Sequence, residues 1–377
     1  MRAFVSTFGL ALIVLLLVDV FKAVVLARRA RGEFRITRFF YQSTWPIFAT
    51  IGRRIESGQR RESFLGIYGP LSLLLLFFFW AVGLILGFAL IGWSATSNNG
   101  GMHSFGDALY HSAASFLTVG AGDMPHGFSR WITISEAGLG FSFLALVIGY
   151  LPVFYQSFSR RELHISLLDA RAGSPPSAGE LIARQGKYPR QLERQLAAWE
   201  EWAADLLQDE LSYPMLAYFR SQHLNQSWIG ALVAITDTSA LVFLSAKDEL
   251  KHQAEATFAM ARHALIDSCK VLGIKPHPNG RDRLSHAAFD KTREIINDAD
   301  AVLDSRLLRE QDITKLGASY EAYADALSLH LLMAIPAWIP ESNPADNWRI
   351  TSAKQSEPIF AVSDPFHEED EEDERSA

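Results

Sequence analysis

The hexapeptide Thr-Val-Gly-Ala-Gly-Asp at residues 118–123 is the part of the sequence best suited to a defined chemistry. Its alternate glycines, Gly120 and Gly122, permit a backbone whose successive carbonyl groups all point one way, which side chains with a Cβ atom resist. Such a row of carbonyl oxygens can replace the water shell of a cation. The same residues would also suit a glycine-rich turn between two helices, so the interpretation depends on the segments around them.

Three long apolar segments surround this motif or precede it. The first carries two charges, Asp19 and Lys22, the second carries none, and the third carries only Glu136; the segments are Phe4–Ala27, Pro70–Trp93 and Trp131–Phe158. Each is long enough for the roughly 20 helical residues that cross a hydrocarbon core. We therefore predict a multi-pass membrane protein, with Asp19 and Lys22 forming an internal pair near the end of the first span.

The distribution of arginine predicts the orientation in the membrane. Residues 28–67 contain Arg28, Arg29, Arg31, Arg35, Arg38, Arg53, Arg54, Arg60 and Arg61. An excess of arginine marks a cytoplasmic segment, so we expect a basic cytoplasmic loop here and the N-terminus outside. The third span then returns to Arg160 and Arg161 on the cytoplasmic side. We expect the cell inner membrane as the location, with the C-terminal domain in the cytoplasm.

Residues 105–125, FGDALYHSAASFLTVGAGDMP, are too polar and too short to cross the bilayer, although spans flank them on both sides. Asp107 suits the first turn of a short helix over residues 106–117. Non-helical backbone at membrane depth persists only where protein buries it or water lines it. This favours a re-entrant segment in which residues 118–123 line a pore.

The order of outer span, short helix, TVGAGD and inner span resembles the pore-loop potassium channels. It resembles more closely the prokaryotic potassium channel family with one pore loop per chain. The resemblance covers about residues 68–158, and the first span with its arginine-rich continuation is also similar to that group. It implies a homotetramer in the lipid membrane, or four-fold closure by some other assembly, since four filter strands must surround one axis.

The resemblance also implies roles for individual residues. K⁺, the transported ion, would bind the carbonyl oxygens of Thr118, Val119, Gly120 and Ala121; Gly122 would contribute to the outer sites, and Asp123 would cap the outer mouth. The family carries Tyr or Phe at position 121, whose ring packs against the pore helix and holds the filter open. Tyr110 and His111 stand where an aromatic pair is found elsewhere, and Ala114 stands where some members keep a carboxylate behind the filter.

The third span contains candidate gating residues. Gly140 matches the position of a hinge glycine in related channels, but a small residue there would equally suit close packing against the pore helix. Gly149 and Pro152 are further candidates, because proline removes a backbone hydrogen bond and favours a kink. Glu136 is costly in lipid, so we expect a structural carboxylate hydrogen-bonded to pore-helix or filter groups.

The remainder of the chain has soluble composition and no strand pattern, so we predict an all-α fold throughout. Helices are expected at 177–184, 189–209, 214–222, 226–246, 248–272, 283–299 and 310–334. The apolar segment 227–246 suits either a buried helix or a fourth span, and Asp237 at its centre favours the buried helix. The predicted parts are an N-terminal transmembrane helix (1–27), a basic loop (28–67), a pore domain (68–158: outer helix 70–93, pore helix 106–117, filter 118–123, inner helix 131–158), a linker (159–176), a helical cytoplasmic domain (177–340) and a disordered acidic tail (341–377).

Several other functions find no support in the sequence. There is no G-x-G-x-x-G fingerprint, no Cys/His cluster with metal-ligand spacing, and no nucleophile with its base, so we expect no enzyme, no organic cofactor and no nucleic-acid partner. The single cysteine, Cys269, cannot form an intrachain disulfide. The favoured function is a potassium or cation channel gated at the inner helix and by its helical domain, whose ligand or protein partner is unknown. The alternative is a non-selective or non-conducting membrane sensor or scaffold that signals through that domain.

Overall fold

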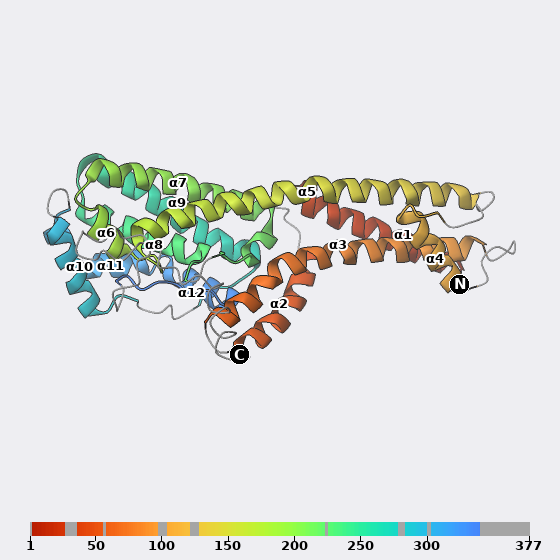
Figure 1. Cartoon of the computed structure of the whole chain (residues 1–377), viewed down its shortest axis with the longest axis horizontal. Coiled ribbons are helices and arrows are strands. Elements are labelled where there is room, and N and C mark those ends of the chain that lie inside the picture. The colour runs from red at the N-terminus through yellow and green to blue at the C-terminus, as the bar shows by residue number, and fades with distance from the viewer. Residues whose placement is uncertain are drawn as a thin grey trace, which may run out of the picture. The chain divides into compact units, whose positions relative to one another are not determined.

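The computed structural model describes residues 2–26, 36–55, 58–96, 104–120, 128–222, 225–277, 283–299 and 303–339. Within these ranges every regular element is a helix and there is no strand (Figure 1), which confirms the predicted all-α class. The filter residues Ala121, Gly122 and Asp123 and the acidic tail at 341–377 lie outside the described residues.

The first and second apolar segments form a closely packed pair of helices. Helix α1 (Arg2–Val20) continues into a π-helical turn, η1 (Phe21–Val25), and lies against α3 (Gln59–Thr96). Small residues allow this contact: a Cβ atom on Gly9 would lie 2.7 Å from the Gly87 carbonyl oxygen. Such close approach of small residues is the usual way in which helices associate in lipid.

Asp19 at the end of α1 has different partners from the Lys22 pair that the sequence predicts. Its carboxylate accepts hydrogen bonds from Thr37 Oγ1 (2.8 Å) and Trp80 Nε1 (3.0 Å). The prediction followed spacing within one helix, whereas the carboxylate is buried between helices and finds its donors there.

The segment predicted as a basic loop at 28–67 is mostly helical where it is described. Helix α2 spans Ile36–Arg54, and α3 already begins at Gln59. Tyr41, Trp45 and Ala49 recur every four residues on the buried face of α2. The arginine content, which indicates the side of the membrane, does not reveal this helical period.

The predicted linker at 159–176 is also wrong over most of its length, because the inner helix does not end at residue 158. Helix α5 is continuous from Phe128 to Ala172 and contains Pro152. It ends where Gly173 adopts a positive φ of 82° and Ser174-Pro175-Pro176 follows. No glycine or second proline interrupts residues 153–172, so nothing in the sequence stops the helix earlier.

The soluble part is a bundle around α8 (Figure 1). Two predicted elements differ from the structure: 214–222 is only a short 3₁₀ turn, and the expected helix 310–334 is broken at 318–320. The described helical elements of this bundle are α6 (Ala178–Gln185), α7 (Pro189–Ser212), η2 (Pro214–Tyr218), α8 (Trp228–Ser245), α9 (Asp248–Leu272), α10 (His286–Ala299), η3 (Ser305–Leu307), α11 (Glu310–Gly317) and α12 (Glu321–Leu331).

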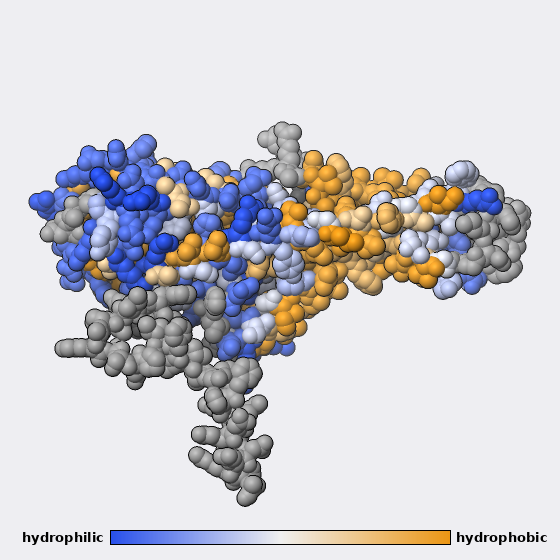
Figure 2. Space-filling model, turned by 45° about the horizontal axis from the view of Figure 1, so that its top comes forward, coloured by the Kyte–Doolittle hydropathy of each residue, from blue (hydrophilic) through white to orange (hydrophobic). Residues whose placement is uncertain are grey.

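Helix α8 is long and apolar enough to cross a membrane, as are the helices at 2–25, 59–95 and 130–172, but nearly all of α8 is buried by the other soluble helices. Its central Asp237 is fully buried and binds Arg283 through two contacts of 2.7 and 2.9 Å. Tyr320 donates a further hydrogen bond to the same carboxylate. Figure 2 shows the corresponding surfaces: apolar residues cover the region of α1 and α3, and hydrophilic residues cover the soluble helices.

Candidate functional site

A short helix, α4 (Phe105–Phe116), precedes the TVGAGD motif and packs against α3 and α5. It begins with a capping box in which Ser104 Oγ accepts from the Asp107 amide and Asp107 Oδ2 accepts from the Ser104 amide, both at 3.1 Å. These contacts satisfy two amides that a helix N-terminus otherwise leaves without partners. Asp107 is therefore the first-turn acid of this helix.

The chain turns back on itself directly after α4. The amides of Val119 and Gly120 donate to the Ala114 carbonyl (2.9 and 3.4 Å), and the Thr118 amide donates to the Ser115 carbonyl (3.1 Å). Thr118 and Gly120 have positive φ angles of 58° and 88°. A β-branched residue rarely adopts this conformation, and its cost is about 1–2 kcal/mol.

The carbonyl oxygens of the same turn have no backbone donor among the described residues. Within the described ranges, no backbone group donates a hydrogen bond to the carbonyls of Thr118, Val119 or Gly120. Val119 is 75% exposed, so this turn is not buried by its own chain. Oxygens that are free and near the surface at the end of a helix are able to bind a dehydrated cation.

The supporting residues suggested by the sequence lie on different faces of α4. Ala114 is buried, whereas Tyr110 is 70% exposed and contacts solvent or lipid when one chain is considered alone. His111 is half-buried. The buried face of α4 carries small residues, Ala108, Ser112 and Ser115, which let the helix approach its neighbours closely.

Glu136 of α5 is buried and accepts a hydrogen bond from Ser112 on α4. The Ser112 hydroxyl also lies 2.8 Å from the Ile85 carbonyl of α3. Ser112 thus joins all three helices of the candidate pore behind the turn. Sequence reasoning missed Ser112, although its position four residues after Ala108 on the small-residue face of α4 was a usable signal.

Gly140 packs directly against the end of α4. A Cβ atom on Gly140 would lie 1.9 Å from the Phe116 carbonyl oxygen, which is far inside van der Waals contact. The geometry therefore favours the close-packing interpretation of Gly140 over a free hinge. In contrast, no atom lies within 4 Å of a Cβ built on Gly149, and α5 runs through Pro152 without a break.

After the apolar part of α5, toward its C-terminal end, side chains of this helix bind the soluble helices. Arg161 is buried and donates to the carbonyls of Leu216 (2.9 Å) and Phe219 (2.7 Å). Ser157 donates to Asp209 of α7 at 3.0 Å. The inner helix and the soluble bundle are therefore held together by specific hydrogen bonds, a junction that the sequence alone did not reveal.

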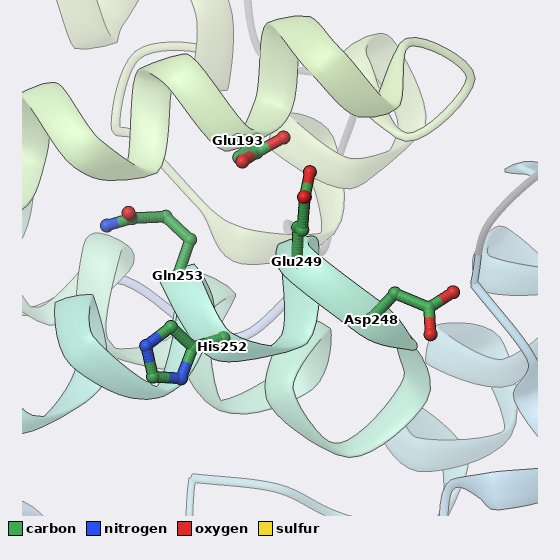
Figure 3. Close-up of a pocket in the computed structure, with 5 residues that line it drawn as sticks. All are labelled: Glu193, Asp248, Glu249, His252 and Gln253. Atoms are coloured by element: carbon green, nitrogen blue, oxygen red, sulfur yellow. The ribbon is translucent and has the colours of Figure 1, made fainter.

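The soluble helices also form a pocket of about 490 Å³ (Figure 3), lined by Glu193 of α7 and by Asp248, Glu249, His252 and Gln253 of α9. Three of the five lining side chains are acidic. Among the residues that the structure describes, no group of three His, Cys, Asp or Glu side chains is placed to hold a metal ion.

The region that contains most of α3, all of α4 and the first part of α5 is similar to a known protein family. Residues 71–157 match a protein family model described as ion channel. No curated protein and no solved structure matches the chain significantly. The matched region contains the apolar helices and the turn at 118–120, so it supports an ion channel of the pore-loop class within a multi-pass membrane protein.

Proposed function

We propose that this protein is a potassium channel in which four copies of the chain surround one pore. The carbonyl oxygens of Thr118, Val119, Gly120 and Ala121 would replace the hydration shell of K⁺, Gly122 would extend the outer sites, and Asp123 would cap the outer mouth. The observation that carries the proposal is the turn after α4, where three amides bind the helix end while no described backbone group donates to the carbonyls of the same residues. The match to ion channels over residues 71–157 supports it.

The four-fold arrangement is supported by surfaces that one chain leaves uncovered. Large apolar residues on α5 are exposed in the single chain, among them Phe141 (67%), Leu144 (56%) and Ile148 (63%). They recur every three or four residues and therefore share one helix face. On the inner helix of a pore, such a face would meet neighbouring copies and the central cavity.

The proposed gate lies in α5 between the pore and the soluble bundle. Gly149 has free space around it and Pro152 lacks an amide proton, so this part of the helix can bend at low cost. Arg161 and Ser157 fasten the next turns to the soluble helices. A ligand or protein that moves the bundle would thereby move the gate.

The orientation follows from the arginines between the first two spans. We place the N-terminus outside and the helical domain in the cytoplasm of a cell whose inner membrane holds the protein. Arg53, Arg54 and Arg60 are exposed at the end that carries the soluble bundle, which is consistent with this direction.

Reconstitution into liposomes tests the proposal. Under opposed K⁺ and Na⁺ gradients, we expect single-channel currents whose reversal potential follows the K⁺ gradient. A current that reverses near zero would identify a non-selective pore, and no current at any protein density would favour a non-conducting sensor. Thr118→Ala should alter conductance or cation block, and unchanged currents would remove Thr118 from the ion path.

A further inference from the structure

Helix α2 has one face that is fully occupied by protein. Tyr41 stacks on Tyr218 with ring centroids 5.1 Å apart, and Trp45 Nε1 donates to the His330 carbonyl at 2.8 Å. Near the end of the helix, Gly52 packs against Leu65 of α3, where a Cβ atom would lie 2.6 Å from a Leu65 methyl group. This face contacts α3 and the soluble bundle at the same time.

The opposite face of α2 carries large apolar residues that are exposed. Phe39 is 70% exposed, Ile47 is 63% exposed and Ile51 is 45% exposed. Their spacings of eight and four residues place them on one side of the helix. One face of α2 is thus covered by protein, while the other exposes large apolar residues that a surface in water does not usually carry together.

The contacts of α2 place it at the edge of the apolar layer. At its start, the Thr37 hydroxyl donates to Asp19, which also binds Trp80 inside the second span. The Phe40 ring lies 6.2 Å from that of Phe79. One turn later, the hydroxyls of Thr44 and Tyr68 are 2.9 Å apart, where the uncharged part of α3 ends.

Positive charge collects where α2 leaves the apolar layer. Arg53 and Arg54 end the helix and Arg60 begins α3; all three are exposed, and none has an ion-pair partner among the described side chains. The nearby Glu62 is bound to Arg220 instead. Arg38 is engaged elsewhere, because its guanidinium lies against Gly273 at the end of α9.

We propose that α2 is an interfacial helix that binds anionic phospholipid. Phe39, Ile47 and Ile51 enter the boundary between headgroups and acyl chains, and Arg53, Arg54 and Arg60 bind the headgroup phosphates. The exposed apolar residues lie on a helix that contacts α1 and α3, and its charged end is complementary to the negative surface of a cytoplasmic leaflet. This inference rests on the membrane orientation under the proposed function but not on conduction.

A lipid-quenching experiment on the full-length protein tests the inference. Ile47→Cys in a Cys269→Ala background is labelled with bimane, and the protein is reconstituted in liposomes that contain increasing mole fractions of either brominated phosphatidylglycerol or brominated phosphatidylcholine. We expect both lipids to quench the label, and the anionic lipid to quench at a lower mole fraction, by about fivefold for each contributing arginine.

Charge variants separate headgroup binding from a structural role of the arginines. In the triple variant Arg53→Gln, Arg54→Gln, Arg60→Gln, the preference for the anionic lipid should fall to about one. The same three positions changed to Lys should keep it. Labels at two other exposed positions provide the controls. The label at Phe4→Cys, near the start of α1, should be quenched equally by both lipids. The label at Leu307→Cys, in the soluble bundle, should not be quenched by either lipid.

Two results would overturn the inference. If neither lipid quenches the label at position 47, the face is covered by a neighbouring copy or lies in water. If both lipids quench it equally in the unmodified arginine background, α2 touches lipid without selecting the anionic headgroup. Neither result depends on ion currents, so failure here is distinct from failure of the proposed channel function.

Discussion

Ala121 occupies the position at which similar potassium channels carry Tyr or Phe. Replacing a packed aromatic ring by a methyl group costs about 3 kcal/mol in protein cores, because a void remains or the backbone shifts. We therefore expect Ala121→Tyr to raise the K⁺ to Na⁺ permeability ratio, measured as a shift of the reversal potential. Ala121→Ser offers a control of similar size, and equal selectivity in all three proteins would show that the missing ring does not limit selectivity.

Gly140 supplies a second prediction at the scale of one residue. Gly140→Ala would place a methyl group against the Phe116 carbonyl, two residues before Thr118. Such overpacking costs about 1–3 kcal/mol, so we expect lower thermal stability and altered conductance. Gly149→Ala is the matched control on the same helix, because open space surrounds that position. A tolerated Gly140→Ala would mean that α5 and α4 separate more readily than this contact indicates.

The buried side chain of Glu210 predicts that the free energy of unfolding of the soluble bundle depends on pH. Burial raises the pKa of Glu210 to about 7, against the effects of the Ser268 hydrogen bond and of Arg161. An unfolded glutamate has a pKa near 4.3. The folded protein therefore holds this proton more tightly, and its stabilising contribution is complete below about pH 4 and is lost as pH rises through about 7.

The variant Glu210→Gln should remove that dependence. At pH 8 it should unfold at a higher temperature than the native protein, by the equivalent of about 3 kcal/mol, and near pH 4 the two should agree closely. Thermal unfolding of the purified protein at several pH values measures this. Glu201→Gln, at an exposed position on the same helix, should leave the pH profile unchanged. Parallel profiles for Glu210→Gln and the native protein would contradict the assignment.

At the scale of elements, α8 depends on the neutralisation of its buried charge. Asp237→Ala would remove the carboxylate that binds the buried Arg283 at 2.7 and 2.9 Å and leave Glu321, at the longer distance of 3.4 Å, as its only described carboxylate partner. Loss of one partner of a buried ion pair costs about 3–5 kcal/mol. We expect strong destabilisation in chemical or thermal unfolding. The double variant Asp237→Leu, Arg283→Met should recover most of the loss. Asp290→Ala on α10, where the side chain is 58% exposed, is the control. A mild effect of Asp237→Ala would place α8 in a more polar environment.

The helices themselves were largely predictable from the sequence, and the interruptions between them were not. Apolar spans and capping residues identify where α1, α4, α8 and α9 lie, because they act within a few residues of each other. The helical character of 36–54 was missed, because the residues that its buried face contacts, Tyr218 and His330, lie far away in the chain. For the same reason the contacts of Arg161 could not be assigned, because the carbonyl oxygens that it binds lie on another element. The position of Ser112 on the small-residue face of α4 was a usable signal, but its two partners on α3 and α5 were not predictable.

For the whole molecule, the number of chains in the assembly is the decisive quantity. The chain supplies one TVGAGD segment, and a ring of carbonyl oxygens needs several. We expect four copies in mild detergent or in nanodiscs, measured as mass by light scattering corrected for bound detergent. A monodisperse monomer or dimer that still conducts would require a different pore from the one proposed.

The contact between Gly140 and Phe116 divides α5 into two parts with different freedom. Above it, the helix is fixed to the base of the turn that presents the carbonyl oxygens. The 12 residues from Gly149, where the proposed bend lies, to Arg161 form an arm of roughly 18 Å at 1.5 Å per residue. Under the proposed gating, a tilt of about 10° at Gly149 would displace the Arg161 end by about 3 Å, so a modest swing of the soluble bundle would widen or narrow the passage while the turn after α4 stays in place.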